Sequence, residues 1–168
     1  MRSLYFIGVG LHLLAAIFWI GGQLFLALAV VPVVRQPAFR ALSPALLQAL
    51  GLRFRTLGWI TLGILILTGL INLVARGVTL ELALDPAFWG GAFGRALAGK
   101  LLAVALIIGL NVLHDFWAGP RATRALASDP DGAEAARWRL RASWLARLTL
   151  LASLTAMGFA IFMVRGWP

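Results

Sequence analysis

The chain has 168 residues, of which 61% are hydrophobic and only 12% are charged, and its mean hydropathy is +0.91. A soluble domain carries about 25% charged residues, because its surface needs them. A chain with half that share leaves much of its surface against lipid, so the composition excludes an ordinary soluble domain and predicts an integral membrane protein. No cysteine occurs, which excludes disulfides, zinc–thiolate sites, iron–sulfur clusters and cysteine nucleophiles.

The formal net charge of +9 comes from 15 Lys and Arg residues against 6 Asp and Glu residues. The cations are sparse and flank apolar runs. This pattern is typical of contact with lipid headgroups and of the positive-inside rule rather than of nucleic-acid binding. We therefore expect the lipid bilayer as a partner and no nucleic acid.

Four apolar runs are long enough to cross a membrane. Each approaches the ~20 residues that a helix needs for a hydrocarbon core of about 30 Å, and the alternation typical of barrel strands is missing. The first run exceeds the apolar region of a signal peptide, so we interpret it as a retained helix. The predicted architecture is an all-α, up-down four-helix membrane bundle with short interfacial helices in its connections. It is one transmembrane domain over residues 1–168, with spans at 4–34, 55–76, 98–118 and 143–165.

The positive charges predict the orientation of the bundle. Five Lys and Arg residues lie on the side of the two termini and the 76–100 connection, and ten lie on the opposite side. By the positive-inside rule, both termini are outside and the connections 36–54 and 120–141 are cytoplasmic. We expect a multi-pass protein of the inner (cytoplasmic) membrane.

His12 is the first candidate functional residue, because ionisable side chains at membrane depth are costly. Gly8 and Ala16 lie one turn to each side of it, and Trp19 lies further along the same face. This space would let a flat ligand approach, although small residues also suit plain helix packing. At 1.5 Å per residue, His12 and Met157 each lie roughly 12 Å in from the outer ends of their spans. The pair could therefore bind one metal ion.

A second polar cluster is expected near the inner ends of the third and fourth runs. Asn111, His114 and Asp115 lie on the third run, and Arg147 begins the fourth at a similar depth. An unpaired charge there would be costly, so we expect an ion pair between Asp115 and Arg147. Solvated interfacial side chains are the alternative. His114 lies only about 8 Å from the inner end of its span, too far from His12 to share one metal ion with it.

The small number of histidines and methionines in the sequence favours haem over copper. Two histidines and two internal methionines are few for a copper pathway, which usually needs several soft ligands in succession. A b-type haem needs one histidine or a His/Met pair, with apolar residues around its ring. The residues assigned to haem are His12 and Met157 as iron ligands, Trp19 as a stacking partner, Gly8 and Ala16 beside the ring, and Lys100 with Arg76 or Arg95 for the propionates.

Three segments resemble membrane proteins of the CopD copper-resistance type. In chain order they are His12-Leu-Leu-Ala-Ala-Ile-Phe-Trp19-Ile-Gly21-Gly22, Arg53-Phe-Arg-Thr-Leu-Gly-Trp59 with Thr68-Gly69-Leu-Ile-Asn72, and Lys100-Leu-Leu with Asn111 and His114-Asp115-Phe-Trp-Ala-Gly119-Pro120-Arg121. The resemblance covers most of the chain. It implies a role in copper uptake or copper tolerance.

The first run is also similar to that of HemJ-type protoporphyrinogen oxidases, which are four-helix membrane proteins associated with haem. His12, Trp19 and Lys100 match that pattern, whereas residues 23–34 lack the arginine that the HemJ family carries late in its first helix. The similarity implies a scaffold that holds haem, without implying oxidation of protoporphyrinogen.

Three functions stay open from the sequence. The preferred function is haem binding for electron transfer or haem handling, which would allow a haem-linked oxidoreductase with a redox partner. Copper transport or copper tolerance is the alternative, and a cofactor-free subunit or assembly partner of a membrane complex, or of a homo-oligomer, is the third. Paired carboxylates inside the spans, a phosphate-binding loop and a serine triad are missing, which excludes hydrolases and ATPases.

Overall fold

The computed structural model describes residues 2–39 and 41–165, with side chains from Tyr5 onward. Over this part of the chain the regular structure is helical, and four helical stretches are long and apolar enough to cross a membrane. The prediction of an all-α protein with four spans is therefore confirmed. The four stretches are Tyr5–Val34, Ser43–Ala75, Ala92–Ser128 and Ala133–Arg165.

The elements follow one another with short connections. In chain order they are α1 (Arg2–Phe25), the π-helical η1 (Leu26–Val30), α2 (Val31–Val34), the 3-10 helix η2 (Pro37–Phe39), α3 (Ser43–Ala75), α4 (Leu80–Leu84), α5 (Pro86–Gly90), α6 (Ala92–Val112), the π-helical η3 (Leu113–Ala118), α7 (Gly119–Ser128) and α8 (Ala133–Arg165).

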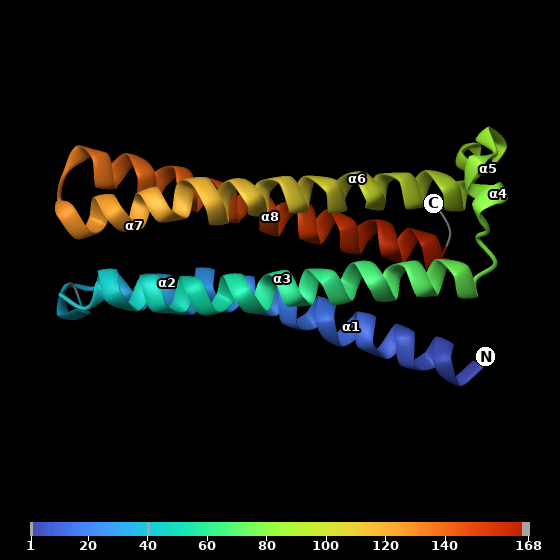
Figure 1. Cartoon of the computed structure of the whole chain (residues 1–168), viewed down its shortest axis with the longest axis horizontal. Helices are drawn as coiled ribbons and strands as arrows, with labels where there is room; N and C mark the ends of the chain where they lie inside the picture. Colours follow the sequence, from blue (N-terminus) through green and yellow to red (C-terminus); the bar gives the residue numbers. More distant parts are fainter. Residues whose placement is uncertain (1, 40, 166–168) are drawn as a thin grey trace.

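The long helices form two antiparallel hairpins. α1 packs along α3, and α6 packs along α8 (Figure 1). One end of the bundle holds the start of α1, the end of α8 and the short helices α4 and α5, and we call it the terminal end. The opposite end, which we call the turn end, holds the connections from α2 to α3 and from α7 to α8 (Figure 1).

The two hairpins meet in one buried layer, which we call the central layer. All four long helices contribute to it: Trp19, Leu62, Ala103, Ile107, Ala152 and Ala156. Trp19 is 4% exposed, and its Nε1 donates a hydrogen bond to Ser153 Oγ at 2.9 Å. Its large ring and satisfied polar tip therefore join α1 to α8 in the middle of the bundle.

Large apolar side chains are exposed along all four long helices. Examples are Phe6, Ile17, Ile66, Leu102 and Leu151. A soluble monomer rarely exposes so much contiguous apolar surface. The outside of the bundle therefore suits the hydrocarbon interior of a lipid bilayer.

Three of the four helical stretches are longer than the spans that the sequence predicted. The 76–100 connection does contain short helices, α4 and α5, whereas the interfacial helix expected in residues 36–54 is the beginning of α3, which has 33 residues. At 1.5 Å per residue α3 is roughly 50 Å long, well beyond a hydrocarbon core of about 30 Å. Pro44 lies in the first turn of α3, where its missing N–H leaves no bond unmade, so it starts this helix rather than separating two elements.

Candidate functional site

His12 of α1 faces α3, where a hydrogen bond fixes its ring. Its Nδ1 lies 2.8 Å from Thr68 Oγ1, and the Thr68 hydroxyl donates its own hydrogen to the carbonyl of Ile64 at 2.6 Å. Because the hydroxyl proton is used there, Thr68 accepts a hydrogen bond from His12, so Nδ1 carries the ring proton. The neutral ring then carries its lone pair on Nε2, and a neutral imidazole is the form that ligates a metal ion.

The small residues around His12 are in contact with the protein itself. A Cβ on Gly69 would lie 3.4 Å from His12 Cε1, and a Cβ on Gly8 would lie 3.1 Å from Asn72 Oδ1. These glycines bring α1 and α3 together, and the slot expected beside Gly8 for a flat ligand is filled by Asn72. Ala16 is half-buried one turn further along α1. Asn72 Oδ1 is buried, and no partner for it lies among the described residues.

Positive charge gathers beside His12 at the terminal end. Lys100 of α6 is half-buried and lies within electrostatic range of His12, and Arg76 at the end of α3 lies within range of Lys100. Arg95 instead donates a hydrogen bond to the carbonyl of Gly90. A pair of cations at the mouth of the bundle attracts anions and repels free cations.

Two further residues assigned to haem, Trp19 and Met157, have other surroundings than the sequence predicted. Trp19 is in the central layer, bonded to Ser153, rather than open to a ligand ring. Met157 of α8 is 48% exposed. The structure thus gives His12 a partner on α3, Thr68, that the sequence did not predict.

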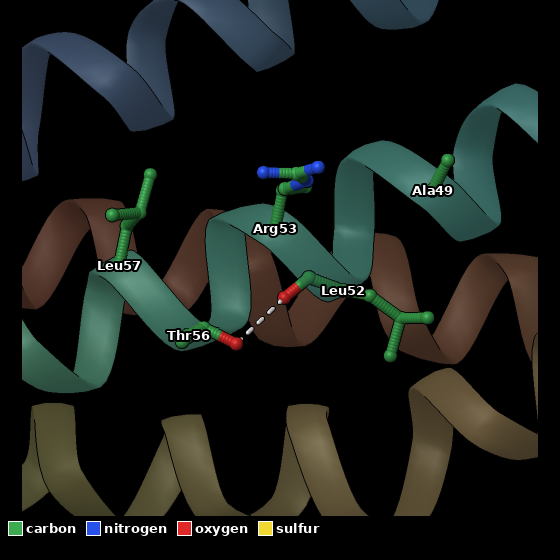
Figure 2. Close-up of a pocket in the computed structure, with 5 residues that line it drawn as sticks. All are labelled: Ala49, Leu52, Arg53, Thr56 and Leu57. Carbon is green, nitrogen blue, oxygen red and sulfur yellow. Dashed lines mark hydrogen bonds between the residues drawn. The ribbon is translucent and has the colours of Figure 1, made fainter.

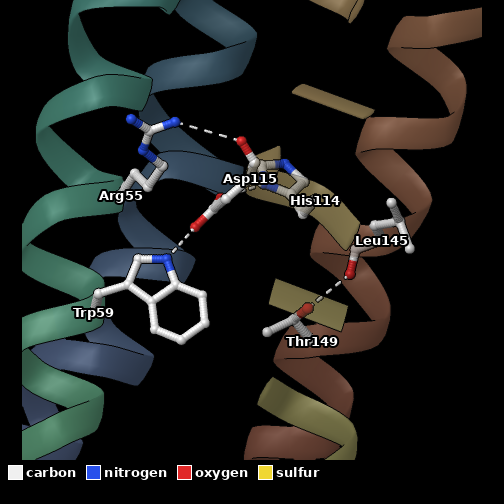
Figure 3. A network of polar contacts seen from close by, with 6 residues as sticks. All are labelled: Arg55, Trp59, His114, Asp115, Leu145 and Thr149. Carbon is white, nitrogen blue, oxygen red and sulfur yellow. Dashed lines mark hydrogen bonds and ion pairs between the residues drawn. The ribbon is translucent and has the colours of Figure 1, made fainter. Parts of the chain in front are cut away.

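Asp115 is the centre of a polar cluster toward the turn end, which we call the Asp115 cluster. Its Oδ1 lies 2.9 Å from His114 Nδ1, and its Oδ2 accepts a hydrogen bond from Trp59 Nε1 at 2.9 Å (Figure 3). Arg55, one turn before Trp59 on α3, donates to the main-chain carbonyl of Asp115 at 3.5 Å. The Asp115 side chain is 10% exposed, whereas that of His114 is 34% exposed. The cluster joins the two hairpins through polar groups.

Arg147 does not belong to the Asp115 cluster. Its guanidinium lies over the Trp144 ring, 5.3 Å from the centroid, and its side chain is exposed. Among the described residues no ion pair joins it to Asp115, so the predicted pair is wrong. Both carboxylate oxygens of Asp115 already have partners, and Arg147 has a cation–π partner on its own helix. Asn111 lies one turn before the His114–Asp115 pair and is half-buried.

His114 and Asp115 lie in the π-helical segment η3. A π-helical turn contains one residue more than an α-helical turn and occurs often at functional sites. Gly119 follows the segment at a point of close approach, where a Cβ would lie 2.9 Å from the carbonyl oxygen of His114. At the Gly119-Pro120 pair the chain continues from α6 through η3 into α7. The predicted third span, in contrast, ends at residue 118.

Arginine and tryptophan side chains stack at the turn end. The rings of Trp117 and Trp138 meet edge to face with centroids 5.1 Å apart. Arg121 lies 5.3 Å from the Trp117 ring centroid, and Arg141 lies 4.7 Å from that of Trp138. Aromatic rings and arginine heads of this kind are typical of the membrane–water interface. The Asp115 cluster lies close to this interface, since Trp117 follows Asp115 by two residues.

A shallow hollow on α3 is a weaker candidate site. It is lined by Ala49, Leu52, Arg53, Thr56 and Leu57, which all come from this one helix (Figure 2). Thr56 Oγ1 donates to the carbonyl of Leu52 at 3.1 Å (Figure 2), so its polar group is satisfied within α3. None of the residues that line the hollow is a histidine or a carboxylate, whereas the His12 site and the Asp115 cluster contain such side chains.

Comparisons with known proteins identify the family. A family model described as copper resistance protein D, CopD, matches residues 48–163, which include the Asp115 cluster. A protein of Aquifex aeolicus (strain VF5), described as an uncharacterized protein, is 32% identical over 146 residues, which are 86% of this chain and 84% of the relative. No solved structure matches the chain. With two thirds of its length inside the family model and a multi-pass helical fold, this chain belongs to the CopD family of membrane proteins.

Proposed function

We propose that this protein carries copper across the membrane or confers copper tolerance, and that His12 contacts the ion in the terminal half of the bundle. The observation that carries the proposal is the bond from His12 Nδ1 to Thr68, which places the lone pair of the ring on Nε2. Imidazole is a good ligand for copper. The copper named in the family description supports this choice of metal.

The donor set suits an ion that passes through rather than one that stays. Among the described residues, no three His, Cys, Asp or Glu side chains gather into a group that could hold a metal ion. A single imidazole binds copper weakly enough to release it, and conduction requires such release. Copper is therefore the cargo of the protein in this proposal, rather than a resident cofactor.

The proposed orientation puts His12 on the outer side, and because Lys100 and Arg76 repel free cations there, copper would enter as part of an anionic or neutral complex. Ten of the 15 Lys and Arg residues of the sequence belong to the side predicted to carry the connections 36–54 and 120–141, which supports a cytoplasmic turn end and a terminal end outside. Reporter fusions to both termini test this orientation. Activity of a periplasmic reporter at both termini is expected, and activity of a cytoplasmic reporter there would reverse it.

Haem binding for electron transfer is the second candidate function. One observation favours it, because Lys100 and Arg76 place positive charge near His12, where propionates would bind. Two observations do not fit the arrangement expected for haem: Asn72 fills the space beside Gly8, and Met157 is about half exposed. We therefore rank copper above haem.

Copper content and growth of cells that produce the protein test the two functions together. We expect the wild-type protein to change cellular copper content and growth under copper stress, and His12→Ala to abolish both effects. Leu14→Ala is the control, because Leu14 is 66% exposed on the same helix. A Soret band in the purified protein that disappears in His12→Ala would favour haem instead. Copper effects that persist in His12→Ala would refute the role of His12.

A further inference from the structure

The two histidines of the chain lie on opposite sides of the central layer. His12 precedes Trp19 by seven residues on α1, toward the terminal end. His114 follows Ile107 by seven residues on α6 and η3, toward the turn end. At 1.5 Å per residue each histidine is roughly 10 Å from the layer. An ion that crosses the bundle would therefore meet one histidine before the layer and the other after it.

The ring of His114 is fixed through the same nitrogen as that of His12. Its Nδ1 lies 2.9 Å from Asp115 Oδ1, and an ionised carboxylate can only accept, so Nδ1 carries the proton. The lone pair is then on Nε2. A carboxylate that fixes a histidine in this way is the usual second partner of a metal-binding histidine.

The surroundings hold the carboxylate firmly and leave the histidine accessible. Trp59 occupies the other oxygen of Asp115, and Arg55 binds its main-chain carbonyl (Figure 3). The Arg55 guanidinium also lies 5.5 Å from the centroid of the Phe116 ring. The contrast in exposure is clear, since Asp115 is nearly buried and His114 is about one third exposed. Figure 3 shows the His114–Asp115 pair between α3, which supplies Arg55 and Trp59, and α8.

We propose that His114 Nε2 is a second copper contact, on the turn-end side of the central layer, and that Asp115 positions its ring. The inference rests on the proposed copper function. The ion binds the free lone pair and keeps its oxidation state, and Nδ1 keeps its proton, so no electron or proton is transferred. His12 and His114 are then successive contacts on one path.

Binding stoichiometry tests the second contact. Silver(I), which does not change oxidation state, is titrated into the purified full-length protein in detergent, and bound metal is measured after equilibrium dialysis. We expect two equivalents for the wild type, one for His12→Gln, one for His114→Gln and none for the double variant. Arg147→Gln is the matched control, because this exposed cation lies outside the Asp115 cluster, and it should bind two.

The outcomes separate this inference from the proposed function. If the wild type binds one equivalent that only His12→Gln removes, the second contact is wrong and the first stands. If the wild type binds none, both proposals fail. If His114→Gln still binds two, the second ligand is not His114.

A measurement on the wild type avoids the risk that a variant misfolds. Nitrogen-15 NMR of histidine-labelled protein should show silver shifting the Nε2 signals of both rings, and a His114 signal that does not move would refute the proposal.

The variant Asp115→Asn tests the positioning role of Asp115. It should weaken the second site about 10- to 100-fold and leave the first unchanged. Equal weakening of both sites would indicate a general structural role for Asp115.

Discussion

Replacement of Thr68 by valine tests whether the hydroxyl makes His12 a ligand. Thr68 is almost fully buried, and its Oγ1 accepts from His12 Nδ1 at 2.8 Å. Valine has the same shape but no acceptor, so the Nδ1 proton would be unpaired at a cost of about 1–3 kcal/mol. The ring can escape this cost by moving its proton to Nε2, which removes the lone pair that binds metal. At about 1.4 kcal/mol per factor of ten, we expect silver binding at His12 to weaken about 10- to 100-fold.

The assay for this prediction is the silver titration described above, with Thr68→Ser as the control. Serine keeps the hydroxyl, so its affinity should stay close to the wild-type value. Size-exclusion chromatography and thermal unfolding would verify that both variants keep their fold. Wild-type affinity in Thr68→Val, or equal losses in the valine and serine variants, would refute the reasoning that Thr68 fixes the ring.

Three further predictions concern packing and the polar residues. Gly8→Val should destabilise the bundle by about 1–3 kcal/mol in thermal unfolding, because its Cβ would press on α3. Gly10→Val is the control and should be tolerated, because a Cβ on Gly10 meets nothing within 4 Å. Met157→Leu should leave silver binding unchanged, and a lost equivalent would restore Met157 as a ligand. Trp59→Phe should lower stability by about 1–3 kcal/mol, because it leaves Asp115 Oδ2 without its donor; an unchanged unfolding temperature would show that this bond contributes little.

The spans were predictable because they depend on composition alone. Long apolar runs between arginines predict helices of membrane length wherever their neighbours lie. The true helix starts were harder to predict, since Pro44 and Pro120 resemble boundaries in a sequence. In the structure both prolines lie in the first turn of a helix, where proline fits.

The partners of the polar residues were harder to predict, because a sequence gives depth along a helix but not the direction that a side chain faces. His114 and Asp115 were identified as a polar pair from their position on the third run. Arg147 has a similar depth but points to Trp144, whereas Trp59 and Arg55, from the neighbouring hairpin, reach Asp115. Which helices become neighbours is decided by packing over the whole bundle.

The direction that a side chain faces also explains why the sequence did not predict the partner of His12. Depth alone paired His12 with Met157, whereas α1 packs along α3, and the nearest polar group is therefore the Thr68 hydroxyl. A hydroxyl in an apolar run carries little signal in a sequence, because threonine usually bonds to its own helix. Thr68 does so as well, through the carbonyl of Ile64, and this second bond fixes the direction of the bond with His12.

Copper flux through the purified protein tests the central claim most directly. The protein is reconstituted into liposomes that contain a coloured copper(I) chelator, and copper(I) is added outside under reducing conditions. The account predicts that wild-type protein and Leu14→Ala accelerate colour formation over empty liposomes, and that His12→Gln reduces the rate to that of empty liposomes. Equal rates for wild-type protein and His12→Gln, or no acceleration by the wild-type protein, would contradict it.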